Sequence, residues 1–138
     1  MSRFIEWRHD GRRLIIPLII QAPEPLFSVD GYNGIALVDT GATISAVTPR
    51  VVRTLQLPQL GKRPLASAQG EGQAERYLFR FALQANRVHA PSFPFVFEEV
   101  VGFELTDSFQ FDALIGMDIL SQCDFEMLRN GICRLTFG

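Results

Sequence analysis

The sequence lacks several features that would assign it to a particular class of protein. It has only two cysteines, Cys123 and Cys133, which are too few for a disulfide framework and match no zinc motif. It has no stripe of basic residues, so we expect no nucleic-acid partner. Its first apolar run, residues 14–20, contains Pro17 and is too short to cross a bilayer, and no targeting segment is visible before it.

These absences favour a cytoplasmic protein with reduced thiols and no membrane partner. The alternative for the two thiols is a bond between them across a local hairpin. The two histidines have no Cys or His neighbour at ligand spacing, so we expect no metal and no other cofactor.

The composition is that of an ordinary globular protein, and the length suits one domain over residues 1–138. Apolar residues make up 47% of the 138 positions and charged residues 20%, with a net charge of −2. Twelve phenylalanines stand out, and because Phe has a high β-propensity they favour a sheet protein.

Short β-rich runs alternate with turn signals along the chain, a pattern typical of an all-β sandwich or barrel. We also expect two short helices, one over Pro49–Leu55 with Thr48 as its cap and one from about Gly116 to Leu120. The strand over 77–83 alternates and should bury one face. The predicted strands are 4–8, 14–21, 34–38, 77–84, 93–97 and 132–137, and the predicted turns lie at 10–11, 30–31, 33–34, 70–72 and 130–131.

A carboxylate directly follows one of the apolar runs. Residues 35–38 read Ile-Ala-Leu-Val, as expected for a strand buried on both faces, and Asp39-Thr40-Gly41-Ala42 comes next. A carboxylate there is costly unless it is hydrogen-bonded or paired, and Gly41 lets the backbone turn so that N–H groups can reach it. Since Asp, Thr and Gly are all common turn residues, a plain turn is the alternative.

A second strand–glycine–helix junction lies further along the chain. Leu114 and Ile115 end an apolar run that Gly116 interrupts, and Asp118 falls in the first turn of the helix expected after it. Taken together, the Asp39 loop and this junction resemble the retropepsin-like (retroviral-type) aspartic protease family, over residues 13–138. The pair Met117-Asp118 is closer to cellular and bacterial members than to viral ones.

The resemblance implies a closed all-β barrel with one or two short helices, assembled as a two-fold homodimer. It implies that Asp39 is the catalytic carboxylate, supported by Thr40, Gly41 and Ala42. It also implies a flap hairpin at about 65–77 that covers an extended polypeptide substrate, with Ala68, Gln69 and Gly70 near its tip. The flap is less rich in glycine than viral flaps, a departure from the family pattern that bears on substrate choice.

The chemistry itself calls for a second carboxylate. Acid-protease hydrolysis uses two carboxylates around one water, and such a pair shares one proton because two close negative charges repel. The sequence contains one Asp-Thr-Gly, and neither Asp112 nor Asp118 is followed by Ser/Thr-Gly. We therefore expect a dimer axis to place Asp39 beside its copy. Two alternatives are a non-catalytic peptide-binding or dimerisation module and a monomeric Phe-rich β-domain with a chance turn.

Overall fold

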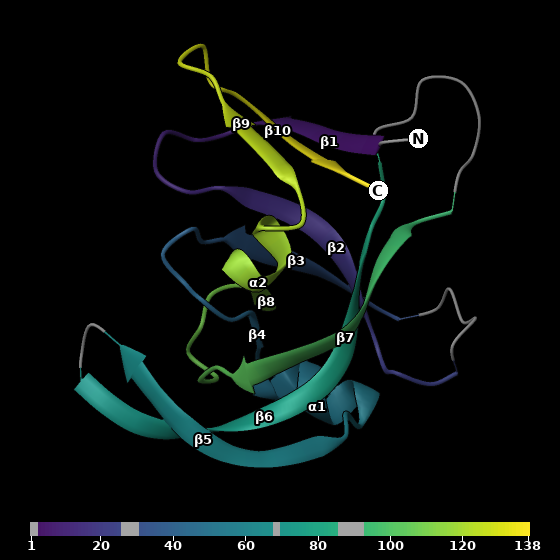
Figure 1. The fold of residues 1–138 in the computed structure, drawn as a ribbon, viewed down its shortest axis with the longest axis vertical. Helices are drawn as coiled ribbons and strands as arrows, with labels where there is room; N and C mark the ends of the chain where they lie inside the picture. Colours follow the sequence, from purple (N-terminus) through teal and green to yellow (C-terminus); the bar gives the residue numbers. More distant parts are fainter. Residues whose placement is uncertain (1–2, 26–30, 68–69, 86–92) are drawn as a thin grey trace.

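The computed structural model describes residues 3–25, 31–67, 70–85 and 93–138, with the side chains of 66–71 left out. Figure 1 shows a molecule built almost entirely of strands, with two short helices. The strands are β1 (Arg3–Arg8), β2 (Ile15–Gln21), β3 (Tyr32–Val38), β4 (Ala46–Val47), β5 (Gln59–Ser67), β6 (Gly70–Leu83), β7 (Phe95–Glu104), β8 (Ala113–Ile115), β9 (Asp124–Met127) and β10 (Ile132–Phe137); the helices are α1 (Pro49–Leu55) and α2 (Met117–Leu120).

Six of the strands form a closed barrel, which confirms the predicted fold class. They follow the order β2-β3-β8-β4-β7-β6, and β2 also pairs with β6, which closes the ring. β5 continues the sheet beyond β6 as the outer strand of a long hairpin. In Figure 1 this hairpin curves away from the barrel below β7.

The barrel brings two distant segments side by side in parallel. β3 pairs with β8 so that Val38 lies opposite Ile115, and the carboxyl ends of both strands emerge together. β4 pairs antiparallel with β8 on its other side. Asp39 and Gly116 therefore leave the sheet next to each other although they are far apart in the sequence.

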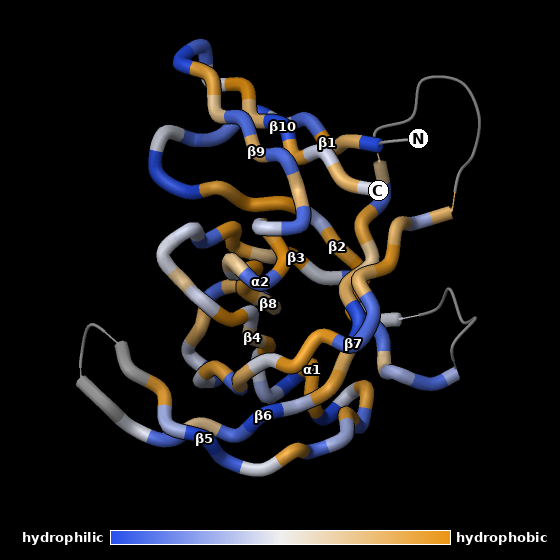
Figure 2. Tube along the Cα trace, in the orientation of Figure 1, coloured by the Kyte–Doolittle hydropathy of each residue, from blue (hydrophilic) through white to orange (hydrophobic). Residues whose placement is uncertain are grey.

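The barrel interior is filled by aliphatic and aromatic side chains. β2 is mostly hydrophobic along its length, as Figure 2 shows, and Ile16 and Ile20 on it are fully buried. Phe79 and Phe81 of β6 are also fully buried, with ring centroids 5.0 Å apart. A separate three-stranded sheet, β1-β10-β9, packs onto this core through Ile5, Leu135 and Phe137.

Two expectations about burial were wrong. The run 35–38 is not buried on both faces, because only Ala36 and Val38 face the core while Ile35 is 47% exposed. Conversely, the end of β6 from Phe79 to Leu83 is buried on both faces rather than on one. Arg80 is only 3% exposed there, and its guanidinium donates to the carbonyls of Ala22 and Pro25, both at 2.9 Å.

Several local boundaries also differ from the prediction. Asn33 and Gly34 lie inside β3 rather than in a turn, since they pair with Ile19 and Leu18 of β2. Gly70 and Gly72 lie in β6 for the same kind of reason. β7 begins at Phe95 and continues to Glu104, well beyond the expected strand, and β5 was not expected as a strand over its full length. The residues expected to turn at 30 and at 68–69 lie outside the described part of the chain.

Both predicted helices are present. α1 begins at Pro49 after Thr48, but the Thr48 side chain does not cap it, because its hydroxyl donates to the Asp112 carbonyl at 3.3 Å instead. Neither helix of the described residues is long and apolar enough to cross a membrane. Cys123 and Cys133 are not bonded to each other.

Candidate active site

The Asp39 carboxylate sits at the end of β3 in a tight, hydrogen-bonded loop, as the sequence predicted. The backbone N–H of Asp39 donates to the Ile115 carbonyl at 2.9 Å, and this hydrogen bond holds the loop against β8. Its carbonyl accepts from Ala42 N–H at 3.2 Å, and its Oδ1 accepts from Gly41 N–H at 2.9 Å. A Cβ on residue 41 would lie 3.2 Å from Oδ1, so glycine keeps room for this close approach. Asp39 itself is half-buried.

The loop borders a pocket of about 460 Å³ whose lining is mostly apolar. Asp39 and Ala42 of the same loop both line this pocket. Leu65 of β5 also lines the pocket, so the β5–β6 hairpin contributes to it. The remaining lining comes from Gly41, Thr43, Ile44, Ala46, Phe103, Glu104, Leu105 and Leu114.

The second predicted motif packs directly under the loop. Met117 N–H donates to the Ala42 carbonyl at 2.7 Å, and Asp118 N–H donates to the Thr43 carbonyl at 3.1 Å. A Cβ on Gly116 would lie 2.9 Å from the Ala42 carbonyl oxygen, so glycine is required by the close approach of the two segments. Leu114 lines the pocket, and Ile115 is fully buried in the core.

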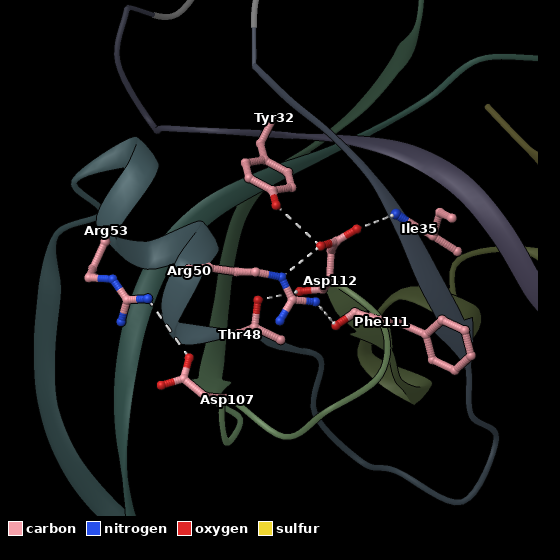
Figure 3. Close-up of polar contacts among 8 residues, drawn as sticks. All are labelled: Tyr32, Ile35, Thr48, Arg50, Arg53, Asp107, Phe111 and Asp112. Carbon is pink, nitrogen blue, oxygen red and sulfur yellow. Dashed lines mark hydrogen bonds and ion pairs between the residues drawn. The ribbon is translucent and has the colours of Figure 1, made fainter.

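Asp112 lies at the other end of the β3/β8 pair from Asp39. Its Oδ1 accepts from Arg50 Nε at 3.1 Å and from the Tyr32 hydroxyl at 3.3 Å, and its Oδ2 accepts from Ile35 N–H at 2.9 Å (Figure 3). Both oxygens are thus engaged by α1 and β3. Because β3 and β8 run parallel, Asp112 at the start of β8 cannot meet Asp39 at the end of β3.

Asp118 is nearer to the loop, but its carboxylate is also engaged. Oδ1 accepts from the Ser45 hydroxyl at 2.7 Å and from Ile119 N–H at 3.0 Å, and Oδ2 accepts from Ser45 N–H at 3.1 Å. The two aspartates considered as partners within the chain are therefore both held in structural hydrogen bonds. No nucleophile motif surrounds Ser45 in the sequence, and the structure gives it this supporting contact instead.

A hairpin, β5–β6, is present where the flap was predicted. Its strands pair from Gln59 opposite Tyr77 to Ser67 opposite Gly70, which places Gly70 beside the turn. Ala68 and Gln69, expected at the tip, lie outside the described residues.

Three partners of the site residues were missed in the sequence reading. Tyr32 and Arg50 hold Asp112, and Ser45 holds Asp118. No local pattern could have identified them, because each pair joins residues separated by more than sixty positions. Thr40, next to Asp39 in the loop, is exposed in the single chain.

Burial also affects the thiol that lies just after α2. Desolvation, with a smaller contribution from the Asp124 charge, raises the pKa of Cys123 to about 11. Its Sγ lies 3.5 Å from the Ile119 carbonyl, to which the thiol donates. The proton therefore stays on this sulfur at neutral pH, and Cys123 is a poor nucleophile.

The barrel, the parallel strand pair and the aspartate loop together define a retropepsin-like fold, and comparison with known proteins agrees. The family described as "gag-polyprotein putative aspartyl protease" matches residues 27–122, so the chain belongs to this family of aspartic proteases. The chain is also similar to the crystal structure of a retropepsin-like aspartic protease from Rickettsia conorii, with a TM-score of 0.64 and 18% sequence identity. That match covers 99% of this chain and 94% of the other. No curated protein matches the chain.

Proposed function

We propose that the protein is an aspartic endopeptidase that works as a homodimer, with Asp39 from each copy forming the catalytic pair. The observation that carries this proposal is the placement of Asp39 in a hydrogen-bonded loop at the mouth of an apolar pocket. Asp112 and Asp118 are both engaged elsewhere, so a second chain is the simplest source of the second carboxylate.

The proposed reaction needs both carboxylates in different protonation states. The ionised one takes a proton from a water held between them, and the protonated one donates a hydrogen bond to the peptide carbonyl. The water oxygen bonds to the carbonyl carbon, the C–N bond then breaks, and the leaving nitrogen takes up a proton from the carboxyl pair, which replaces the one that the pair removed from the water. The exposed Thr40 hydroxyl would exchange hydrogen bonds with its counterpart across the axis and so keep the two loops together.

The substrate would be a polypeptide in extended form. Backbone hydrogen bonds to a strand-like peptide supply affinity, and the pocket beside Asp39 accepts an apolar side chain from it. The β5–β6 hairpin would close over the peptide and exclude water, since Leu65 already lines the pocket.

A non-catalytic module that binds peptides or only dimerises is the second candidate function. The likeness of fold is compatible with it. The half-buried Asp39, however, is a costly group to retain at a surface that only binds, which favours the enzyme.

Replacement of Asp39 tests the proposal. Asp39→Asn keeps the shape of the side chain but cannot supply the charged base, so turnover of a peptide library between about pH 4 and 7 should disappear. The matched control is Asp10→Asn, because Asp10 also accepts backbone N–H groups, from Arg12 and Arg13, but in an exposed turn. Sedimentation should show both variants as folded dimers. Turnover by Asp39→Asn at the rate of the parent would overturn the assignment, and no turnover by the parent would favour the binding module.

A further inference from the structure

A polar contact outside the reacting groups joins the far end of the aspartate loop to α2. The Ser45 side chain is completely buried, and its hydroxyl makes two hydrogen bonds at once. It donates to Asp118 Oδ1 at 2.7 Å and accepts from Gly116 N–H at 3.0 Å. One hydroxyl thus connects the loop to the glycine and to the helix that follow β8.

The Asp118 carboxylate completes the connection from the other side. Its Oδ2 accepts from Ser45 N–H at 3.1 Å, while Oδ1 accepts from Ile119 N–H as well as from the Ser45 hydroxyl. Every one of these partners is a donor. An amide in place of the carboxylate would present its NH₂ to at least one N–H group, so a carboxylate is required rather than merely tolerated.

These contacts leave little freedom for the loop that carries Asp39. Its start is held by Asp39 N–H on the Ile115 carbonyl at 2.9 Å. Its middle is held by the bonds from Met117 N–H to Ala42 and from Asp118 N–H to Thr43. Its end is held by Ser45, so the whole segment 39–45 is fastened to residues 115–118.

We propose that Ser45 and Asp118 are positioning residues, which set the place of the Asp39 carboxylate without touching the substrate. This inference rests on the proposed function. In a symmetric dimer each loop must present its carboxylate to the same water. A shift of one loop is repeated in the other, so both shifts add to the change in the distance between the two carboxylates. Since a misplacement of about 1 Å can cost on the order of a hundredfold in rate, these buried contacts should matter for turnover.

A double-mutant cycle tests the inference. Asp118→Asn, Ser45→Ala and the double variant are compared with the parent for kcat and KM on one peptide. Each rate is divided by the number of active dimers, titrated with a tight-binding transition-state analogue, so that partial unfolding does not enter the result. We expect each single change to lower kcat by about 10- to 100-fold with KM within about threefold, because substrate contacts are untouched.

The double variant should lose little more than either single one, because both residues act through one hydrogen-bonded unit. Asp10→Asn serves as the control for loss of a carboxylate that accepts backbone N–H groups, and it should keep the parent kcat. If Asp118→Asn gives too few active dimers to measure, Ser45→Ala alone decides. A kcat per active dimer within threefold of the parent, a loss confined to KM, or effects of the two changes that simply multiply would each overturn the inference. An inactive parent would instead overturn the proposed function.

Discussion

The Asp112 carboxylate connects three elements of the fold, at the end of the β3/β8 pair away from Asp39. It joins β8, β3 and α1, because its carboxylate accepts from Ile35 N–H, Arg50 Nε and the Tyr32 hydroxyl (Figure 3). The Asp112 side chain is only 18% exposed and that of Arg50 is 34% exposed, so the charges are partly withdrawn from water. Loss of the carboxylate would leave a guanidinium and a backbone N–H without their acceptor, which is the costly way to break a polar contact.

Asp112→Ala should therefore lower the free energy of unfolding by about 2–3 kcal/mol. Urea unfolding at a fixed protein concentration measures the change, as a lower midpoint at constant slope. The matched control in Figure 3 is Asp107→Ala, because Asp107 pairs with Arg53 of the same helix at 3.8 Å but both side chains are about two-thirds exposed. The control should change stability by less than about 0.5 kcal/mol. Equal effects of the two substitutions would mean that the Asp112 contacts do not stabilise the barrel.

At the scale of elements, the parallel β3/β8 pair brings the aspartate loop against Gly116, and the two backbones approach each other closely there. A Cβ at residue 116 would lie 2.9 Å from the Ala42 carbonyl oxygen and 2.9 Å from the Ile44 carbonyl carbon. Both are backbone atoms of the aspartate loop and cannot rotate away. Gly116→Ala should destabilise the protein by about 1–3 kcal/mol, because the loop or α2 must move to make room.

Gly72→Ala is the matched control, since a Cβ there would meet no atom within 4 Å and the backbone needs no left-handed conformation. Thermal unfolding should show a clear drop in the midpoint for Gly116→Ala and almost none for Gly72→Ala. If Gly116→Ala unfolds at the parent temperature, the contact between the loop and α2 is looser than the structure indicates.

The same elements show what could be predicted from the sequence. The Asp39 loop, the Gly116 junction and both helices were found because each has a local signal: a tight-turn glycine after an apolar run, or a proline at a helix start. The full extent of β5 and β7 was not found, because their strand character comes from pairing with β6 and not from their own alternation. Asn33-Gly34 is a strong hairpin signal that tertiary pairing with β2 overrides.

Burial was misjudged wherever it depends on a distant partner. Arg80 lies on the face of β6 that was expected to be open, yet it is buried and its guanidinium donates to the carbonyls of Ala22 and Pro25, just after β2. The Ser45–Asp118 contact was missed for a similar reason, since it joins residues 73 positions apart. The sequence pattern located the Asp39 loop but could not identify the distant residues that hold it.

At the scale of the whole molecule, the proposed mechanism makes activity a property of two chains. Asp39 of one chain has no use without its counterpart, so a dimer with one Asp39→Asn chain should be as inactive as one with two. When the parent is refolded from urea with a tenfold excess of Asp39→Asn, about ten of every eleven parent chains acquire an inactive partner. Peptide cleavage should then fall to about a tenth of the rate that the same amount of parent shows after refolding alone.

Refolding together matters, because preformed dimers that exchange slowly would hide the effect. The control is the same excess of Asp10→Asn, which keeps Asp39 and should raise the total rate in proportion to the added chains. If the catalytic pair were completed within one chain, by Asp112, Asp118 or any other carboxylate, the added Asp39→Asn chains would leave the parent rate unchanged. The mixing experiment therefore distinguishes a site formed by two chains from a site formed within one chain. Only in a site formed by two chains does an inactive chain abolish the activity of its active partner.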